Sequence, residues 1–360
     1  MHLQSSEAFA QKRKVTTMKI QITLALIAIL SASCSTLRTP TQPSLPQSEF
    51  SFFVMGDSPY TKVDEEMLSK VTPIVKASDA PFVIHIGDYK GGGTECTNSY
   101  DDQHDILISN LSPKPVFYTP GDNEWTDCDR NINDVTGKEY SELDRLAKLR
   151  KTKFRTLPNG TAILNAKRQS SQVENVTWRY NNVRFTTLHV VGTNNGRDQV
   201  RGDKLSAAKR AVDLRDRSNS DWLHRVFKRA NRESASALVI ALHGDITDTD
   251  DKPEDLMCTD VSASEEHACD AFTDLRHSIR DHSIKFGKPV LVIHGDTDPF
   301  TLDQKFAGEE AENLWRLNAA GDAGPGYGVS DITEVLVRLG EPSPFSAKGV
   351  MTGKFPATEN

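Results

Sequence analysis

Residues 82–88 have the sequence FVIHIGD, a short apolar run closed by a glycine and an aspartate. The first five residues are mostly aromatic or β-branched, which is typical of a buried strand. Glycine and aspartate directly after such a run favour a turn. The stretch therefore predicts a buried strand that presents the Asp88 carboxylate at its carboxyl end.

The same kind of run recurs along the chain. Strand-type runs cover residues 52–55, 82–86, 116–119, 185–191, 237–242 and 290–293. Apolar residues recur at helical spacing between the first two runs and again before the fifth. Strands that alternate with helices predict an α/β domain. Residues 332–337 alternate less cleanly, which fits an edge strand.

Polar signatures follow five of these runs. They are Gly56-Asp57, Gly87-Asp88, Gly121-Asp122-Asn123-Glu124, His243-Gly244-Asp245 and His294-Gly295-Asp296. The carboxyl ends of strands in an α/β sheet face one crevice, so we expect these side chains to converge. Clustered carboxylates repel one another unless a cation lies among them. Mixed oxygen and imidazole donors suit Zn, Mn or Fe better than Ca or Mg.

The order of these signatures resembles that of the calcineurin-like metallophosphoesterases, whose motifs are GDxH, GDxx, GNH with D or E, a lone His, and GHxH. The matching segments are Gly56 to Tyr60, Gly87 to Lys90, Gly121 to Glu124, His243, and Ile293 to Asp296. The resemblance runs from Phe52 to about Phe345. It implies one α/β domain, residues 49–360, in which two packed mixed β-sheets are flanked by helices in a four-layer sandwich.

The resemblance also implies a site for two divalent ions, drawn from Mn, Fe, Zn or Mg. The implied ligands are Asp57, Asp88, Asp122, His243, His294 and Asp296. Asp88 would bridge the ions. Asp57 and Asp296 would complete the first ion's ligands, and Asp122, His243 and His294 the second's.

The chain departs from the family pattern at two histidines. Pro59 replaces the histidine of the first motif, where the neighbouring Tyr60 offers a phenolate oxygen. Asn123 replaces the histidine that assists the leaving group, and an amide cannot deliver a proton at neutral pH. Glu124 and His189 are the candidate substitutes, although His189 equally fits a hydrogen-bonded core histidine.

Two functions follow from this pattern. The first is a hydrolase that uses two metal ions and a metal-bound hydroxide on a phosphomonoester or phosphodiester. The second is a protein that keeps the family fold but acts as a binding or structural module, which the losses at Pro59 and Asn123 favour.

The N-terminus predicts export. Residues 1–33 contain a short charged start at Met18, the expected true start, and an apolar run from Ile20 to Leu30 that is too short to span a bilayer. Small residues before Cys34 resemble a lipobox, so residues 34–48 would be a lipid anchor and flexible linker. Plain signal cleavage near Ser33 is the alternative. With a lipidated Cys34, the protein would be anchored in the cell envelope and face the periplasm or the outer surface. Otherwise it would be secreted.

Export changes the interpretation of the remaining cysteines. Cys96, Cys128, Cys258 and Cys269 are an even number, and disulfides are expected in an oxidising compartment. Local spacing favours Cys258 with Cys269, which leaves Cys96 with Cys128.

The net charge indicates which kinds of partner the chain can bind. The net charge of −7 gives no support to nucleic-acid binding, which needs a basic face. The basic stretch from Lys148 to Arg155 is interpreted as the solvated side of a helix. A phosphate-ester substrate is the expected partner.

Overall fold

The computed structural model of the chain describes residues 49–248, 258, 269–304, 306–321 and 329–358. These residues belong to one compact unit, residues 45–360. The predicted signal region and linker, residues 1–48, lie outside the described residues. No helix in the described part of the chain has the length and apolar character needed to cross a membrane.

The first sheet has five strands in the order β14-β13-β1-β2-β3. Its strands are β1 (Glu49–Met55), β2 (Val83–His85), β3 (Val116–Tyr118), β13 (Thr333–Arg338) and β14 (Phe345–Gly349). β1, β2 and β3 are parallel, whereas β13 pairs antiparallel with both β1 and β14. β13 therefore lies inside the sheet, and the prediction of an edge strand there was wrong because β14 covers it.

The second sheet has seven strands in the order β11-β12-β10-β9-β8-β7-β6. Its strands are β6 (Lys167–Arg168), β7 (Val176–Tyr180), β8 (Val183–Thr187), β9 (Ala237–Ala241), β10 (Val290–His294), β11 (Thr301–Gln304) and β12 (Leu314–Asn318). The four central strands β8, β9, β10 and β12 are parallel, and the outer strands are antiparallel. Both sheets are thus mixed, as predicted.

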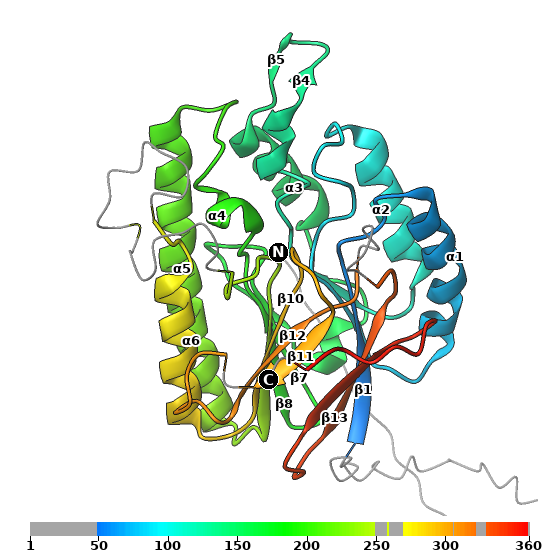
Figure 1. The fold of residues 1–360 in the computed structure, drawn as a ribbon, viewed down its shortest axis with the longest axis vertical. Helices are drawn as coiled ribbons and strands as arrows, with labels where there is room; N and C mark the ends of the chain where they lie inside the picture. Colours follow the sequence, from blue (N-terminus) through cyan, green and yellow to red (C-terminus); the bar gives the residue numbers. More distant parts are fainter. Residues whose placement is uncertain (1–48, 249–257, 259–268, 305, 322–328, 359–360) are drawn as a thin grey trace, which may run out of the picture. The chain divides into compact units, whose positions relative to one another are not determined.

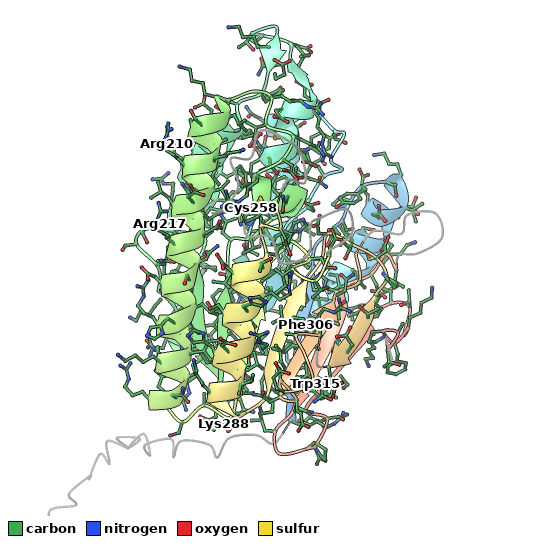
Figure 2. The ribbon with its side chains drawn as sticks, turned by 60° about the vertical axis from the view of Figure 1, so that its left-hand side comes forward. Arg210, Arg217, Cys258, Lys288, Phe306 and Trp315 are labelled. Carbon is green, nitrogen blue, oxygen red and sulfur yellow. A yellow bond between two sulfur atoms is a disulfide. The ribbon has the colours of Figure 1, made fainter. Side chains whose placement is uncertain are left out.

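Helices cover the outer face of each sheet. They are α1 (Lys62–Ala77), α2 (Asn98–Asn110), α5 (Leu205–Arg232) and α6 (Thr273–Phe286). A further helix, α3 (Glu142–Lys153), lies beyond the strand ends, where Leu146 and Leu149 pack with Trp125. In Figure 1, α1 and α2 stand on one side of the sheets and α5 and α6 on the other. Figure 2 brings α5 and α6 forward, with Arg210 and Arg217 marking α5.

Strand alternation explains these layers. Phe52 and Val54 of β1 belong to the core between the sheets, whereas Phe53 and Met55 pack beneath α1. In β9, Val239 faces the inner core and Leu238 and Ile240 pack against α5 and α6. Because both faces of each central strand are buried, the strands are continuous apolar runs in the sequence. This confirms the predicted fold class of two packed mixed sheets flanked by helices.

Short elements complete the described chain. They are the 3-10 helices η1 (Thr126–Arg130) and η2 (Thr161–Leu164), the short turn α4 (Gly192–Gly196), and a small hairpin of β4 (Ile132–Asn133) and β5 (Lys138–Glu139).

Candidate metal centre

Loops at the carboxyl ends of strands from both sheets bring acidic and imidazole side chains together. Two groups of ligand atoms, each within 4.8 Å of one another, can hold a metal ion. The first group is Asp57, Asp88 and His243, and the second is Asp122, His243 and Asp296. The clusters are compatible with divalent metals, and His243 is common to both.

His243 is oriented as a ligand would be. Its Nδ1 lies 2.9 Å from the Ile86 carbonyl oxygen, which can only accept, so Nδ1 carries the hydrogen. Its Nε2 faces Asp88 and Asp122, each 3.4 Å away. Burial alone would lower the pKa of this ring, but the surrounding carboxylates raise it well above its ordinary value. Among the described residues, this buried Nε2 has no hydrogen-bond partner. The carboxylates around Nε2 need a positive charge between them, which a proton on the ring or a bound cation supplies, so the donor set fits a metal ion.

The carboxylates are electrostatically strained without a cation. Burial raises the pKa of Asp57 to about 7, with His243 opposing the shift and Asp296 adding to it. Burial also raises the pKa of Asp88 well above its ordinary value. Burial alone would raise the pKa of Asp122, but the nearby His243 lowers it overall. The cluster holds more negative charge than His243 alone can offset.

The backbone at three of these aspartates is unusual. Asp57, Asp88 and Asp296 have φ values of 49°, 57° and 70°, in the left-handed region. Non-glycine residues avoid this region, and such strain concentrates at functional sites. Gly121 shows how tightly the loops meet, because a Cβ there would lie 2.0 Å from Asp88 Oδ1. The turn geometry thus aims each carboxylate at the cluster.

Tyr60 lies beside the first group. Its hydroxyl donates to Asp88 Oδ2 at 2.8 Å and accepts from Asn123 Nδ2 at 3.1 Å. The Tyr60 amide is held by Asp64 Oδ2 at 3.0 Å, in the same carboxylate that caps α1. Tyr60 therefore stands where Pro59 removed a ligand, next to the predicted catalytic residue Asn123.

Glu124 has a different position from the one expected of a proton donor. Its carboxylate is fully buried and accepts from the Asp88 amide at 3.0 Å, the Gly121 amide at 2.9 Å and the Tyr118 hydroxyl at 2.7 Å. These bonds join the loops that carry Asp88 and Asp122. Glu124 thus fixes the ligand loops rather than facing a substrate.

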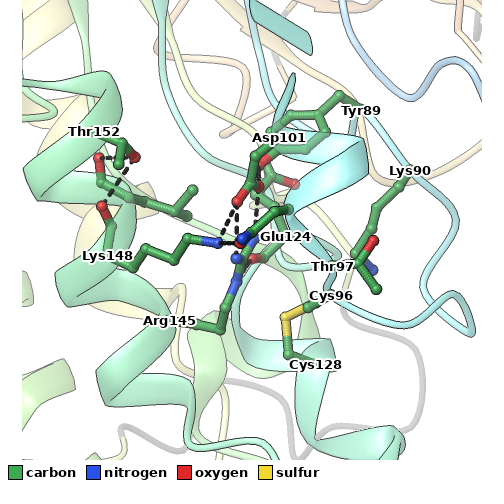
Figure 3. A network of polar contacts seen from close by, with 12 residues as sticks. Tyr89, Lys90, Cys96, Thr97, Asp101, Glu124, Cys128, Arg145, Lys148 and Thr152 are labelled. Carbon is green, nitrogen blue, oxygen red and sulfur yellow. Dashed lines mark hydrogen bonds and ion pairs between the residues drawn. A yellow bond between two sulfur atoms is a disulfide. The ribbon is translucent and has the colours of Figure 1, made fainter. Parts of the chain in front are cut away.

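A network of ion pairs, half-buried at Lys148, lies against Glu124 (Figure 3). Arg145 of α3 donates from Nε to the Glu124 carbonyl at 3.0 Å and binds Asp101 of α2 through both Nη atoms. Lys148 donates to the same Asp101 at 2.6 Å, and Lys153 to the Asp101 carbonyl at 2.6 Å. The basic stretch is therefore partly an anchor between helices, and its interpretation as a solvated face was incomplete.

His189 belongs to the core. It is fully buried, and its Nδ1 lies 3.3 Å from Gln172 Nε2 and 3.7 Å from Glu174 Oε1. Burial lowers the pKa of its imidazole well below the ordinary value, so the ring is neutral. Its ring packs on Trp125 at 5.4 Å. The packing agrees with the core-histidine alternative.

His294 lies outside both groups found among the described residues. Its Nδ1 faces the Gly295 carbonyl at 2.9 Å, and its Nε2 lies 3.7 Å from Asp245. In the register of β9 and β10, Ala241 pairs with Ile293 and both face the inner core. His294 comes one residue after Ile293, so it points to the other face, whereas His243 comes two residues after Ala241. Asp296, not His294, joins His243 from this loop.

A left-handed turn next to the cluster adds a hydroxyl. Thr193, Asn194 and Asn195 of α4 have φ values of 51°, 52° and 56°. The Thr193 hydroxyl lies 3.0 Å from both Asp122 Oδ2 and Asp127 Oδ1. Asp127 was not predicted from the sequence, because no local pattern distinguishes it from a turn residue.

Both predicted disulfides are present. Cys96 pairs with Cys128, and Cys258 pairs with Cys269. The first joins the loop that follows Asp88 to η1, which follows Asp122, and appears beside the ionic network in Figure 3. It therefore links the segments that carry Asp88 and Asp122.

No protein-family model and no curated protein matches the chain. Among solved structures, it is similar to a dimetal phosphatase from Danio rerio, with a TM-score of 0.40 and 13% identity, over 80% of this chain and 95% of that chain. It is also similar to GAP50, the anchor in the inner membrane complex of Plasmodium, with a TM-score of 0.41 and 11% identity, over 85% of this chain and 86% of that one. Both likenesses are distant, and neither fixes the chemistry of this chain.

Proposed function

We propose that this chain is a metal-dependent phosphoric ester hydrolase that acts on a phosphomonoester or phosphodiester. The observation that carries the proposal is the His243 imidazole, whose hydrogen is held by Ile86 while its free Nε2 faces Asp88 and Asp122. Such an arrangement prepares a nitrogen ligand among carboxylates before any ion arrives.

Two ions can be assigned from the groupings. Asp57 and Asp88 would hold the first, Asp122 and Asp296 the second, with His243 placed to bind either. His294 leaves the ligand set. When bound, two divalent ions would activate water and stabilise negative charge on the transferring phosphoryl group. Zn, Mn or Fe suit this mixed donor set best.

The chain's own groups then position the substrate. Asn123 Nδ2 and the Tyr60 hydroxyl lie beside the first group and can hydrogen-bond phosphoryl oxygens. Glu124 holds the Asp88 and Gly121 amides and keeps the two carboxylate loops at a fixed separation. The Thr193 hydroxyl supports Asp122 from the other side.

The third motif favours a second candidate function. Asn123 cannot protonate a leaving group. Glu124 is buried with its oxygens bonded to other groups, and His189 is buried in the core. A chain with this site could bind a phosphate ester or metal without turning it over. As an enzyme, it should prefer esters whose leaving group is a good one, because no proton needs to be delivered.

Activity with model esters tests the proposal. The purified chain without residues 1–34 would be assayed with p-nitrophenyl phosphate and bis-p-nitrophenyl phosphate, with Mn²⁺ added and after chelation. Metal-dependent hydrolysis that disappears in Asp88→Asn is the expected result. A folded protein that is inactive with Mn²⁺, Zn²⁺, Fe²⁺ and Mg²⁺ would contradict it and favour the binding module.

The location of the protein is part of the same proposal. Two disulfides suit an oxidising compartment, as expected of an exported protein. Lipidation of Cys34 would attach the domain to the cell envelope through the linker. Mass spectrometry of the mature N-terminus distinguishes a lipidated Cys34 from plain cleavage near Ser33.

A further inference from the structure

A pair of histidines joins the two helices on the outer face of the seven-stranded sheet. His224 of α5 and His282 of α6 approach with Nδ1 and Nε2 3.4 Å apart. α5 and α6 lie side by side in both views (Figures 1 and 2). His224 is exposed and His282 is half-buried, so the pair is open to solvent.

The His282 ring is fixed before any ligand binds. Its Nδ1 lies 2.8 Å from the Ser278 carbonyl oxygen, which can only accept, so the hydrogen is on Nδ1. The lone pair of Nε2 therefore faces His224. Phe227 packs against the ring at 5.1 Å between centroids. A histidine whose outer nitrogen is held by a carbonyl is typical of metal-bound imidazoles.

We propose that His224 and His282 form a zinc site that links α5 to α6. Zinc binds imidazole nitrogens at about 2.0–2.1 Å in tetrahedral geometry, which places two such nitrogens about 3.3–3.4 Å apart. The observed separation of 3.4 Å matches this value. It is long for a direct hydrogen bond, for which about 2.7–3.2 Å is usual with a nitrogen donor. Water would complete the coordination on the open side.

The ion would act as a reversible clamp and not as a folding nucleus. Phe227 and Phe286 already hold the two helices together, with ring centroids 5.9 Å apart. Zinc would add a second link beside this contact. This site shares no residue with the cluster at the strand ends, so the two can be tested separately.

Zinc titration of the full chain by calorimetry tests the proposal. The variants are His224→Asn, whose amide can still hydrogen-bond to His282, Asp88→Asn in the strand-end cluster, and His277→Asn as a control on the same helix. We expect one class of zinc sites to weaken at least about tenfold in His224→Asn and to persist in both other variants. Thermal unfolding should show a zinc-dependent rise that shrinks in His224→Asn.

Two results would overturn the proposed zinc site. Zinc binding in His224→Asn equal to that of the wild type would overturn the proposal and leave the pair as a hydrogen bond. Loss of every class of zinc site in Asp88→Asn would also overturn it, because zinc would then bind only at the strand ends. A zinc titration of Asp88→Asn identical to that of the wild type would instead count against the proposed metal site at the strand ends.

Discussion

The two sheets contribute different chemistry to the strand-end cluster. The five-stranded sheet delivers only carboxylates, from Asp57, Asp88 and Asp122. The seven-stranded sheet delivers the imidazole of His243 and one further carboxylate, Asp296. The carboxylate loops are tied by Glu124 and a disulfide, whereas His243 is held by a single hydrogen bond across to Ile86. The charge thus comes mainly from one sheet, and the ligand shared by both groups comes from the other.

The largest effect should come from removing this shared ligand. We expect His243→Ala to lose both ions after gel filtration and to lower any hydrolytic activity at least about a thousandfold, since bound ions supply several kcal/mol. His294→Ala is the matched control, because it also removes a fully buried histidine at a strand end. Metal content by mass spectrometry checks both. Equal metal loss in the two variants would mean that His294 binds metal as well as His243.

The pKa of Asp57, raised mainly by burial, predicts a pH effect on stability. The folded chain keeps a proton on Asp57, whose pKa is about 7, over a pH range where the unfolded chain has lost it. The free energy of unfolding of the chelated protein should therefore fall by up to about 4 kcal/mol as pH rises from 4 to 7. Urea titrations at several pH values measure this. Mn²⁺ should flatten the curve, and a slope that persists with saturating Mn²⁺ would argue against an ion at this position.

Removing each disulfide should lower stability by a similar amount but change metal affinity by different amounts. Loss of Cys96–Cys128 should cost about 4 kcal/mol and loss of Cys258–Cys269 about 3 kcal/mol, from loops of 32 and 11 residues. Only the first joins ligand-bearing segments, so the paired Cys→Ser variants should differ more in metal affinity than in stability. Thermal unfolding and metal titration of both variants make the comparison. Similar metal affinities would mean that Glu124 and the ionic network hold the loops unaided.

The smallest effect should come from Tyr60. Tyr60→Phe removes a hydroxyl that bonds Asp88 and Asn123, which should cost about 1–2 kcal/mol, or roughly tenfold, in the first group alone. Calorimetric titration should show one weakened and one unchanged metal site. Weakening of both would mean that Tyr60 supports the whole cluster.

Much of the fold could be predicted from the sequence, because apolar runs closed by Gly-Asp mark strands whose ends converge. The roles of His243 and His294 could not. Both occur as His-Gly-Asp after an apolar run, but the motif is shifted by one residue between β9 and β10, which turns the two rings to opposite faces. Since both faces are apolar, the sequence pattern contains no sign of which residue faces inward.

Glu124 and Tyr60 illustrate a second limit. Glu124 was a plausible acid by its place in the motif, and only the structure shows that its oxygens are used by the Asp88 and Gly121 amides. From the sequence, Tyr60 was predicted only to offer a phenolate oxygen next to Pro59, whereas in the structure its hydroxyl lies 2.8 Å from Asp88. Burial and hydrogen-bond partners, which depend on distant segments, decide such roles.

The left-handed aspartates bear on how this chain has been selected. A glycine would adopt the backbone of Asp57, Asp88 or Asp296 without strain, whereas a non-glycine residue there costs about 1–2 kcal/mol. Selection for folding alone would therefore not retain three acidic side chains at these places. Glycine variants should fold at least as well and bind metal worse. At these three backbone positions the chain would thus give up stability in order to keep carboxylates that can bind a metal ion.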